Sequence, residues 1–156
     1  MRIVLRCGGI IRQGPERDLI DDYLKRANGL TRTCGFQSLT EDQIDLKKEK
    51  NRSDQTRKLL NEIPSSTMRV LLDERGKTLT SRQMAASLEG FKTDGFTECQ
   101  IIIGPADGFD PKLIQPGTAK WAFGVQTWPH KLIRVMLAEQ VYRALSILAS
   151  TPYHRD

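Results

Sequence analysis

Small and polar turns follow three apolar runs between residues 70 and 128, and these turns are the first candidates for chemistry. Leu72 ends the first run, Gly104 follows the second, and Phe123 opens the segment 123–128 after the third. In open parallel sheets, ligands bind outside the carboxyl ends of strands, and glycine there lets a ligand approach the main chain closely. Any one of these turns could simply reverse the chain. Three of them within this stretch predict a binding site.

The end of the chain is the second candidate. Tyr153, His154 and Arg155 follow Pro152 and place an aromatic ring, an imidazole and a guanidinium side by side. Such a group can stack on an unpaired base and hold phosphate. The alternative is that the terminus frays or that Tyr153 packs on a neighbouring element.

The last helix is expected to carry three further candidates, His130, Arg134 and Glu139. Each has an ordinary structural explanation: a histidine at a helix start, a solvated arginine and a surface carboxylate. The sequence alone does not show whether these residues have such structural roles or belong to a functional site.

The usual signatures of several enzyme classes are absent. The turn at Gly104 matches neither G-x-G-x-x-G nor G-x-x-x-x-G-K-[ST], which disfavours kinases and nucleotide triphosphatases. The only histidines, His130 and His154, lie far apart and form no Cys/His cluster, so we predict no metal. No G-x-S-x-G motif occurs. A reaction with an activated donor, such as a sulfonium methyl group, needs mainly orientation from the protein and fits these absences.

Apolar patterning predicts the elements that position these residues. Strands are expected at 3–5, 36–39, 70–72, 101–103 and 121–123. Helices are expected at 15–27, with a stop at Gly29, from Ser53 to Pro64, with Ile63 on the apolar face, and from Thr80 or Ser81 to Phe91. A short helical turn is expected at 110–111 and a long helix at 131–148. The polar stretch 47–52 is expected to be a mobile loop, and the run at 70–72 to end at Asp73. Strands that alternate with helices predict an α/β fold with a parallel sheet, covered on both faces.

Composition limits the protein class. The chain has 156 residues with 24 Lys+Arg against 19 Asp+Glu, which is compatible with one domain over 1–156. Residues 1–60 carry 13 Lys+Arg against 9 Asp+Glu, a bias that suits a polyanionic partner but equally suits a solvated surface. No apolar run spans a bilayer and no signal-peptide pattern is present, so a cytoplasmic protein without a membrane partner is expected. Three widely spaced cysteines predict reduced thiols, with Cys99 in the core.

The C-terminal quarter carries a long motif. Residues 129–144 read P-H-x-L-x-R-V-x-x-A-E-x-x-Y-R-A, and the chain closes with P-Y-H-R-D. Together with Leu72-Asp73 and the Gly104 turn, this sequence is similar to the ribosomal large-subunit methyltransferase H family of the SPOUT superfamily. The N-terminal third is generic by comparison.

The resemblance implies a single-domain parallel-sheet SPOUT fold with a C-terminal trefoil knot, acting as a homodimer. It implies methylation of N3 of pseudouridine 1915 in helix 69 of 23S ribosomal RNA, on the assembled ribosome, with S-adenosylmethionine as donor. The implied donor contacts are Leu72, Gly104, Phe123, Gly124, Val125, Gln126, Thr127 and Trp128. The tail residues Tyr153, His154 and Arg155 would complete the catalytic site across the dimer, and His130, Arg134 and Arg155 would contact RNA.

One position departs from the family pattern. The family loop usually reads I-G-G-P-x-G, whereas Gly104 is followed here by Pro105, which has no N–H to donate. Two other functions remain open at this stage. A non-catalytic RNA-binding module on the same fold would show no uptake of S-adenosylmethionine, and a small-molecule enzyme would act independently of RNA and salt.

Overall fold

The computed structural model describes residues 1–61, 64 and 66–155. Its elements in chain order are β1 (Arg2–Gly8), α1 (Pro15–Thr31), β2 (Leu39–Ile44), α2 (Arg52–Leu60), β3 (Thr67–Thr78), α3 (Ser81–Thr93), β4 (Glu98–Ile103), the short 3-10 helix η1 (Pro111–Leu113), β5 (Ala119–Ala122) and α4 (His130–Leu148). No described helix has the length and apolarity needed to cross a membrane.

The five strands form one sheet in the order β2-β1-β4-β3-β5, and every neighbouring pair is parallel. This confirms the predicted α/β class. All five strands therefore run towards the same edge of the sheet, where Leu72, Gly104 and Phe123 lie. The predicted trefoil knot stays a prediction.

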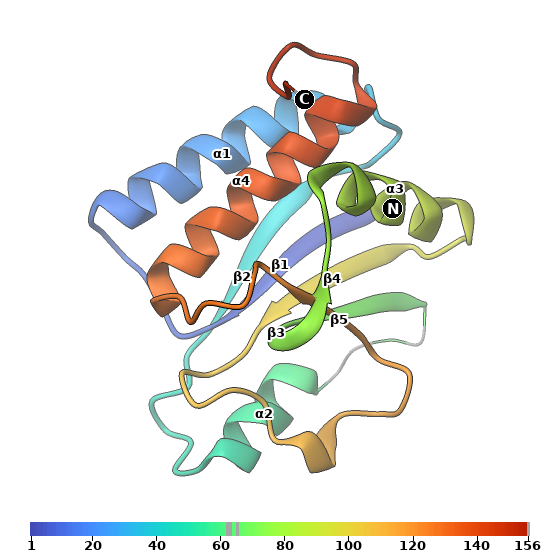
Figure 1. Cartoon of the computed structure of the whole chain (residues 1–156). Coiled ribbons are helices and arrows are strands. Elements are labelled where there is room, and N and C mark those ends of the chain that lie inside the picture. Colours follow the sequence, from blue (N-terminus) through green and yellow to red (C-terminus); the bar gives the residue numbers. More distant parts are fainter. Residues whose placement is uncertain (62–63, 65, 156) are drawn as a thin grey trace.

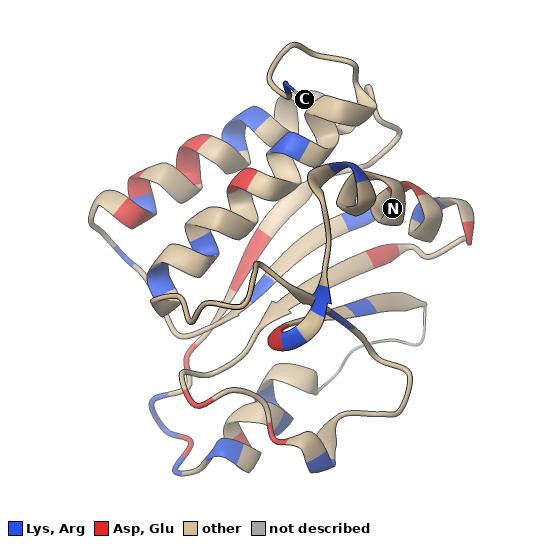
Figure 2. Cartoon of the chain, in the orientation of Figure 1, with Lys and Arg blue, Asp and Glu red and all other residues tan. Residues whose placement is uncertain are grey.

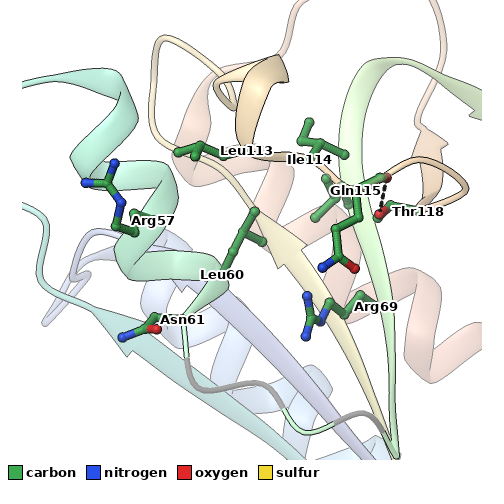
Figure 3. Close-up of a pocket in the computed structure, with 9 residues that line it drawn as sticks. Arg57, Leu60, Asn61, Arg69, Leu113, Ile114, Gln115 and Thr118 are labelled. Atoms are coloured by element: carbon green, nitrogen blue, oxygen red, sulfur yellow. Dashed lines mark hydrogen bonds between the residues drawn. The ribbon is translucent and has the colours of Figure 1, made fainter.

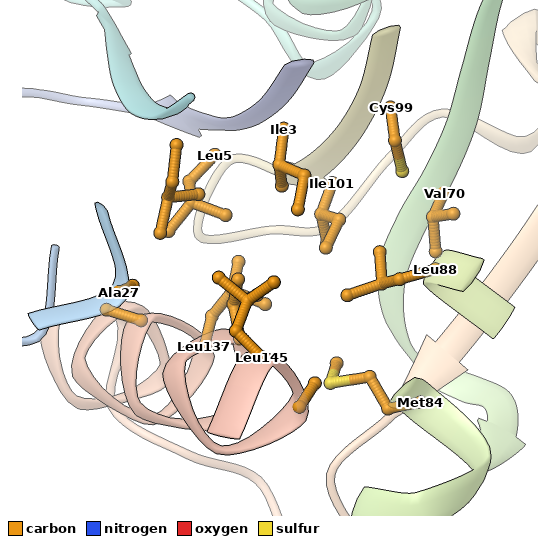
Figure 4. Close-up of a cluster of buried hydrophobic side chains, with 14 of the residues drawn as sticks. Ile3, Leu5, Ala27, Val70, Met84, Leu88, Cys99, Ile101, Leu137 and Leu145 are labelled. Atoms are coloured by element: carbon orange, nitrogen blue, oxygen red, sulfur yellow. The ribbon is translucent and has the colours of Figure 1, made fainter. Parts of the chain in front are cut away.

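Helices cover both faces of the sheet, as expected. Helices α1, α3 and α4 lie on one face, and α2 with η1 lies on the other (Figure 1). The larger apolar core lies under the three helices and includes Ile3, Ile101, Leu88 and Leu137 (Figure 4). A smaller cluster under α2 contains Leu46, Leu59, Leu71, Ile102 and Phe109. Every residue of β4 is buried, which explains its uninterrupted apolar run.

The three cysteines are buried free thiols, as predicted. Cys99 lies in the larger core, and burial raises its pKa to about 12. Burial also raises the pKa of Cys7 to about 12. Both thiols therefore stay protonated at neutral pH and serve as small apolar residues.

The second strand was predicted too early in the chain. It runs over Leu39–Ile44, not over 36–39, and Phe36 instead lies buried in the preceding turn. The prediction missed this strand because its positions 41 and 43 are polar and show no alternation of apolar residues. In the structure, the side chains of Glu41 and Gln43 bind Arg17 and Arg134 in a buried network. A strand at the sheet edge can carry such a pattern because only one neighbour pairs with it.

Two helix ends also differ from the predictions. Helix α1 continues past Gly29 to Thr31, where packing against α4 outweighs the weak helix preference of glycine. Helix α2 is capped by the Asn51 side chain, which accepts from the N–H of Asp54, and not by Ser53. The helix ends at Leu60, and the predicted position of Ile63 lies outside the described residues. Of the two predicted starts of α3, Thr80 is its N-cap, and the short helix expected at 110–111 is confirmed as η1, with Asp110 as its N-cap.

Strand β3 does not end at Asp73. It pairs with β4 up to Leu72, shifts register, and pairs again with β5 through Lys77 and Thr78. Between these stretches Gly76 lies directly on the main chain of β5, since a Cβ there would be 2.6 Å from the carbonyl carbon of Trp121. Gly76 is therefore a close crossing of two main-chain segments rather than a turn.

Candidate functional site

Leu72 and the turns after β4 and β5 meet at the carboxyl edge of the sheet, although the turn predicted after Leu72 is wrong because β3 continues to Thr78. Leu72 pairs with Ile103 of β4 on one side and with Trp121 of β5 on the other. Gly104 directly follows β4, and Phe123 directly follows β5. Three segments separated by 19 to 51 positions in the sequence thus begin side by side.

Gly104 is held by three neighbouring elements. Its carbonyl oxygen accepts a hydrogen bond of 2.9 Å from Nε2–H of His130, the first residue of α4. The same oxygen would lie 3.2 Å from a Cβ at Gly8, at the end of β1. A Cβ at Gly104 would come within 2.9 Å of the buried Phe109 ring. No larger side chain fits at Gly104 without movement of this ring or of the turn.

The turn after Gly104 is anchored to the first turn of α2. Pro105 contributes its carbonyl oxygen, which accepts from the N–H of Gly108 at 2.9 Å. The Arg52 guanidinium donates to the carbonyl oxygens of Gly108, at 3.2 Å, and Phe109. Arg52 was assigned to the loop 47–52 from sequence, and nothing in its local sequence indicates this contact. The structure adds it to the residues that shape the site.

A second bridge joins α2 to the same turn. The Ser53 hydroxyl donates to the Asp110 carboxylate, and the Asp110 N–H donates to Oγ1 of Thr56 at 2.9 Å. The hydrogen bond from Ser53 lowers the pKa of Asp110. With Arg52, these contacts fix both ends of the segment 108–110.

The segment 123–128 closes on itself. The Trp128 indole donates to the carbonyl oxygen of Phe123 at 3.0 Å, and Gly124 has φ +98°, a conformation that side chains disfavour. Val125 is 93% exposed, and Gln126 and Thr127 are also exposed. The segment therefore offers main-chain groups and solvent-facing side chains at the edge of the sheet.

A cavity of about 270 Å³ adjoins this segment. It lies between the end of β5, the start of α3 and the middle of α4. Its lining is mainly apolar and consists of Leu79, Thr80, Ser81, Met84, Trp121, Ala122, Phe123, Met136 and Gln140. An apolar ring system could enter here beside Phe123.

His130 is half-buried at the start of α4. Burial lowers its pKa, the hydrogen bond to Gly104 raises it, and the charge of Arg134 lowers it again. The pKa of His130 is lowered overall, which favours the neutral imidazole at pH 7. Because Nε2–H donates to Gly104, the neutral ring presents Nδ1 as an acceptor.

Arg134 lies one turn further along α4 and is only 1% exposed. Its guanidinium donates to the Gly9 carbonyl oxygen and to Oε1 of Gln43, at 3.3 Å in the second case. Glu41 lies 3.8 Å away and also pairs with Arg17 of α1 at 2.5 Å. Arg134 thus joins α4 to the ends of β1 and β2 below the surface, and is not the solvated arginine that one explanation assumed.

The tail packs back on the middle of α4. The Tyr153 hydroxyl donates to Oε1 of Glu139 at 2.9 Å, and its ring lies 4.5 Å from that of Tyr142 and 4.7 Å from the Arg143 guanidinium. Burial and the Glu139 contact raise the pKa of Tyr153. His154 is half-buried and Arg155 is exposed.

The tail and the three turns do not meet within one chain. Tyr153 contacts Glu139, nine positions after His130, which corresponds to about 13 Å along the helix axis. The packing alternative stated for Tyr153 is therefore the one the structure shows. His130 and Gly104 lie together, whereas Tyr153 lies about two and a half helical turns away.

A separate cavity of about 200 Å³ lies on the α2 side of the sheet (Figure 3). Its lining includes Arg57, Arg69 and Gln115 but none of the residues predicted to form the site. In the described part of the chain, no group of three or more His, Cys, Asp or Glu side chains could hold a metal ion.

Comparison with known proteins covers the whole chain. A family model described as predicted SPOUT methyltransferase matches residues 1–154. The ribosomal RNA large subunit methyltransferase H of Maricaulis maris is 46% identical over 156 residues, covering 100% of both chains. The proteins of the same name from Dinoroseobacter shibae and Hyphomonas neptunium are 43% and 41% identical, each over 99% of both chains.

Proposed function

The chain belongs to the SPOUT methyltransferase family, and on this premise we propose that it methylates ribosomal RNA of the large subunit with S-adenosylmethionine. The specific target proposed is N3 of pseudouridine 1915 in helix 69 of 23S ribosomal RNA, on the assembled ribosome. The whole of 1–156 would serve as one methyltransferase domain. A ribosomal substrate also places the proposed activity in the cytoplasm.

The meeting of Leu72, Gly104 and the segment 123–128 at one sheet edge is the observation that carries this proposal. These residues fit the donor because Gly104 lets its turn pack tightly on the buried Phe109 ring at the sheet edge, while Gly124 adopts a positive φ in the segment that offers main-chain groups there. The apolar cavity beside Phe123 suits the adenosine part. When bound, S-adenosylmethionine supplies an activated methyl group, so the protein has mainly to hold and orient the reactants.

The decisive experiment is methyl transfer from labelled S-adenosylmethionine to ribosomes from a strain that lacks the endogenous enzyme. We expect label in 23S RNA, at N3 of the pseudouridine in helix 69. No incorporation under conditions in which a related enzyme works would refute the proposal. Calorimetry would then show whether the protein binds the donor at all, as a pure RNA-binding module would not.

We propose in addition that the active unit is a homodimer. Within one chain, Tyr153 contacts Glu139 in the middle of α4, about 13 Å along the helix from His130, which contacts Gly104. The tail that completes the donor turns is therefore proposed to come from a second copy. Large apolar side chains are exposed near the donor turns, including Trp128, Leu132 and Ile10. Their burial in an isologous interface would favour association.

Mixed dimers test this arrangement. We expect homodimers of Gly104→Val and of Arg155→Ala each to be inactive. A purified heterodimer of the two should recover about half the wild-type activity, because one of its two sites combines an intact turn with an intact tail. If each tail serves its own chain, the heterodimer will be as inactive as its parents. Arg155→Ala alone should leave the affinity for S-adenosylmethionine unchanged.

Arg52 should affect donor binding although it lies on α2. Arg52→Lys keeps the charge but loses the planar fork that joins two carbonyl oxygens of the turn. We expect about a 10-fold loss of affinity for S-adenosylmethionine, measured by calorimetry, from the loss of about 1.4 kcal/mol of hydrogen bonding. Arg57→Lys is the matched control, since Arg57 lies on the same helix and, within the described residues, its side chain pairs with Asp54 on that helix and with none of the residues of the donor turn. Equal losses in both variants would contradict the anchoring role.

A further inference from the structure

The loop between β2 and α2, residues 45–51, carries three lysines against two carboxylates, Asp45 and Glu49, and Asp45 accepts from the Lys47 main-chain N–H at 3.0 Å. Lys47, Lys48 and Lys50 are exposed, and no ion pair of theirs is found in the part of the chain that the structure describes. The nearby carboxylate of Glu49 is already paired with Lys58 at 2.7 Å. We call residues 45–51 the lysine loop. Figure 2 shows its basic residues near the start of α2.

The lysine loop is anchored beside the donor turns. Leu46 is buried in the cluster under α2, and a Cβ at Gly8 would lie 2.8 Å from Leu46 and 3.2 Å from the Gly104 carbonyl oxygen. On its other side, the Lys58 ammonium donates to the Asp45 carbonyl oxygen at 2.8 Å. These contacts hold the three lysines at the same sheet edge as Gly104.

The loop also continues directly into the residues that hold the donor turn. Asn51 caps α2, and Arg52 follows it and donates to Gly108 and Phe109. A ligand on the lysine loop is thus connected to the turn after Gly104 through two consecutive residues. A polyanion bound to this loop would therefore lie beside the turn after Gly104 and not in it.

We propose that the lysine loop docks the phosphate backbone of the ribosomal RNA substrate. This inference rests on the proposed function and names the surface that recognises its substrate. Exposed ammonium groups without carboxylate partners can replace the counterions of RNA phosphates, which provides affinity and orientation without reading sequence. The unpaired base would then lie towards Gly104, while the backbone lies on the loop.

The test is the double variant Lys47→Gln/Lys48→Gln, which leaves Lys50 and the Asn51 cap unchanged. We expect binding to purified ribosomes, measured by co-sedimentation, to weaken about 10-fold at low salt. The slope of log affinity against log salt should fall by about 1 to 2. Affinity for S-adenosylmethionine and turnover at saturating ribosome concentration should stay at the wild-type level.

The matched control is Lys25→Gln/Arg32→Gln, which removes two exposed positive charges from α1 and the residue after it. It should change neither ribosome affinity nor the salt slope. An unchanged salt slope in the lysine-loop variant, or an equal change of slope in the control, overturns the docking proposal. In either case the proposed function still stands if the wild-type protein methylates ribosomes. Wild-type protein that neither binds nor methylates ribosomes overturns both.

Discussion

Gly104→Val is expected to lower both the affinity for S-adenosylmethionine and the rate of methyl transfer by about 100-fold, the effect of displacing a reacting group by about 1 Å. A Cβ at this position would lie 2.9 to 3.1 Å from three atoms of the Phe109 ring. Phe109 is buried under α2 and cannot swing into solvent. The turn itself must therefore move, and it carries the carbonyl group that His130 holds. Calorimetry and single-turnover methyl transfer measure the two losses.

A second variant separates this displacement from general unfolding. Overpacking costs about 1 to 3 kcal/mol, so Gly104→Val should still fold but melt earlier. In Gly104→Ala/Phe109→Leu, the ring-edge atoms that meet the new Cβ are gone. We expect this double variant to bind the donor more tightly than Gly104→Ala alone. If it does not, the Cβ blocks the donor directly and displacement of the turn is not the cause.

Glu41→Gln is expected to lower the free energy of unfolding by about 3 to 5 kcal/mol, the typical cost of removing one partner from a buried ion pair. Glu41 lies between Arg17 and Arg134, at 2.5 and 3.8 Å. Without its charge, buried Arg134 loses its ion-pair partner and Arg17 keeps only the pair with the exposed Asp21. Urea denaturation followed by circular dichroism measures the loss.

Asp21→Asn is the matched control for this prediction. Asp21 also pairs with Arg17, at 2.8 Å, but its side chain is 63% exposed. We therefore expect a loss below about 1 kcal/mol. Adding Arg134→Met to Glu41→Gln should restore part of the lost stability, because only one buried charge then remains. Equal effects of Glu41→Gln and Asp21→Asn would show that the network is not effectively buried.

These two experiments probe different parts of the same edge of the sheet. The first acts on the turn that we propose holds the donor, and the second on the network that fixes the start of α4 against β1 and β2. His130 connects them, because it begins the helix that Arg134 anchors and donates to Gly104. Loss of the Glu41 charge should therefore also weaken donor binding in protein that remains folded.

Local patterns in the sequence were sufficient for the elements with strong local causes. The β-branched run at 101–103 predicts a buried strand, and β4 is buried throughout. Thr80 and Gln83 have the spacing of a capping box, and both of its hydrogen bonds form. The apolar stripe of α4 likewise predicts its extent to within one residue. In each case the deciding contacts lie within a few positions along the chain.

Contacts between distant segments decided the rest. The polar residues 40–44 have no strand pattern, because Glu41 and Gln43 are buried only after Arg17 and Arg134 fold against them. Asp73 does not end β3, because Gly76 meets a strand that lies 45 positions later. Arg52 has no local signal for its place, since its partners Gly108 and Phe109 lie 56 and 57 positions away.

The same division holds for the site. The sequence by itself determined that glycine-containing turns follow buried strands, because small residues and apolar runs are local properties that parallel pairing then aligns. Only the tertiary structure decided that His130 holds Gly104, that Arg134 is buried, and that Tyr153 of the tail contacts Glu139 in the middle of α4. The physical reason is that hydrogen bonds and ion pairs depend on side-chain positions within a few tenths of an ångström. Sequence patterns specify which face a residue occupies, but not which distant group it meets there.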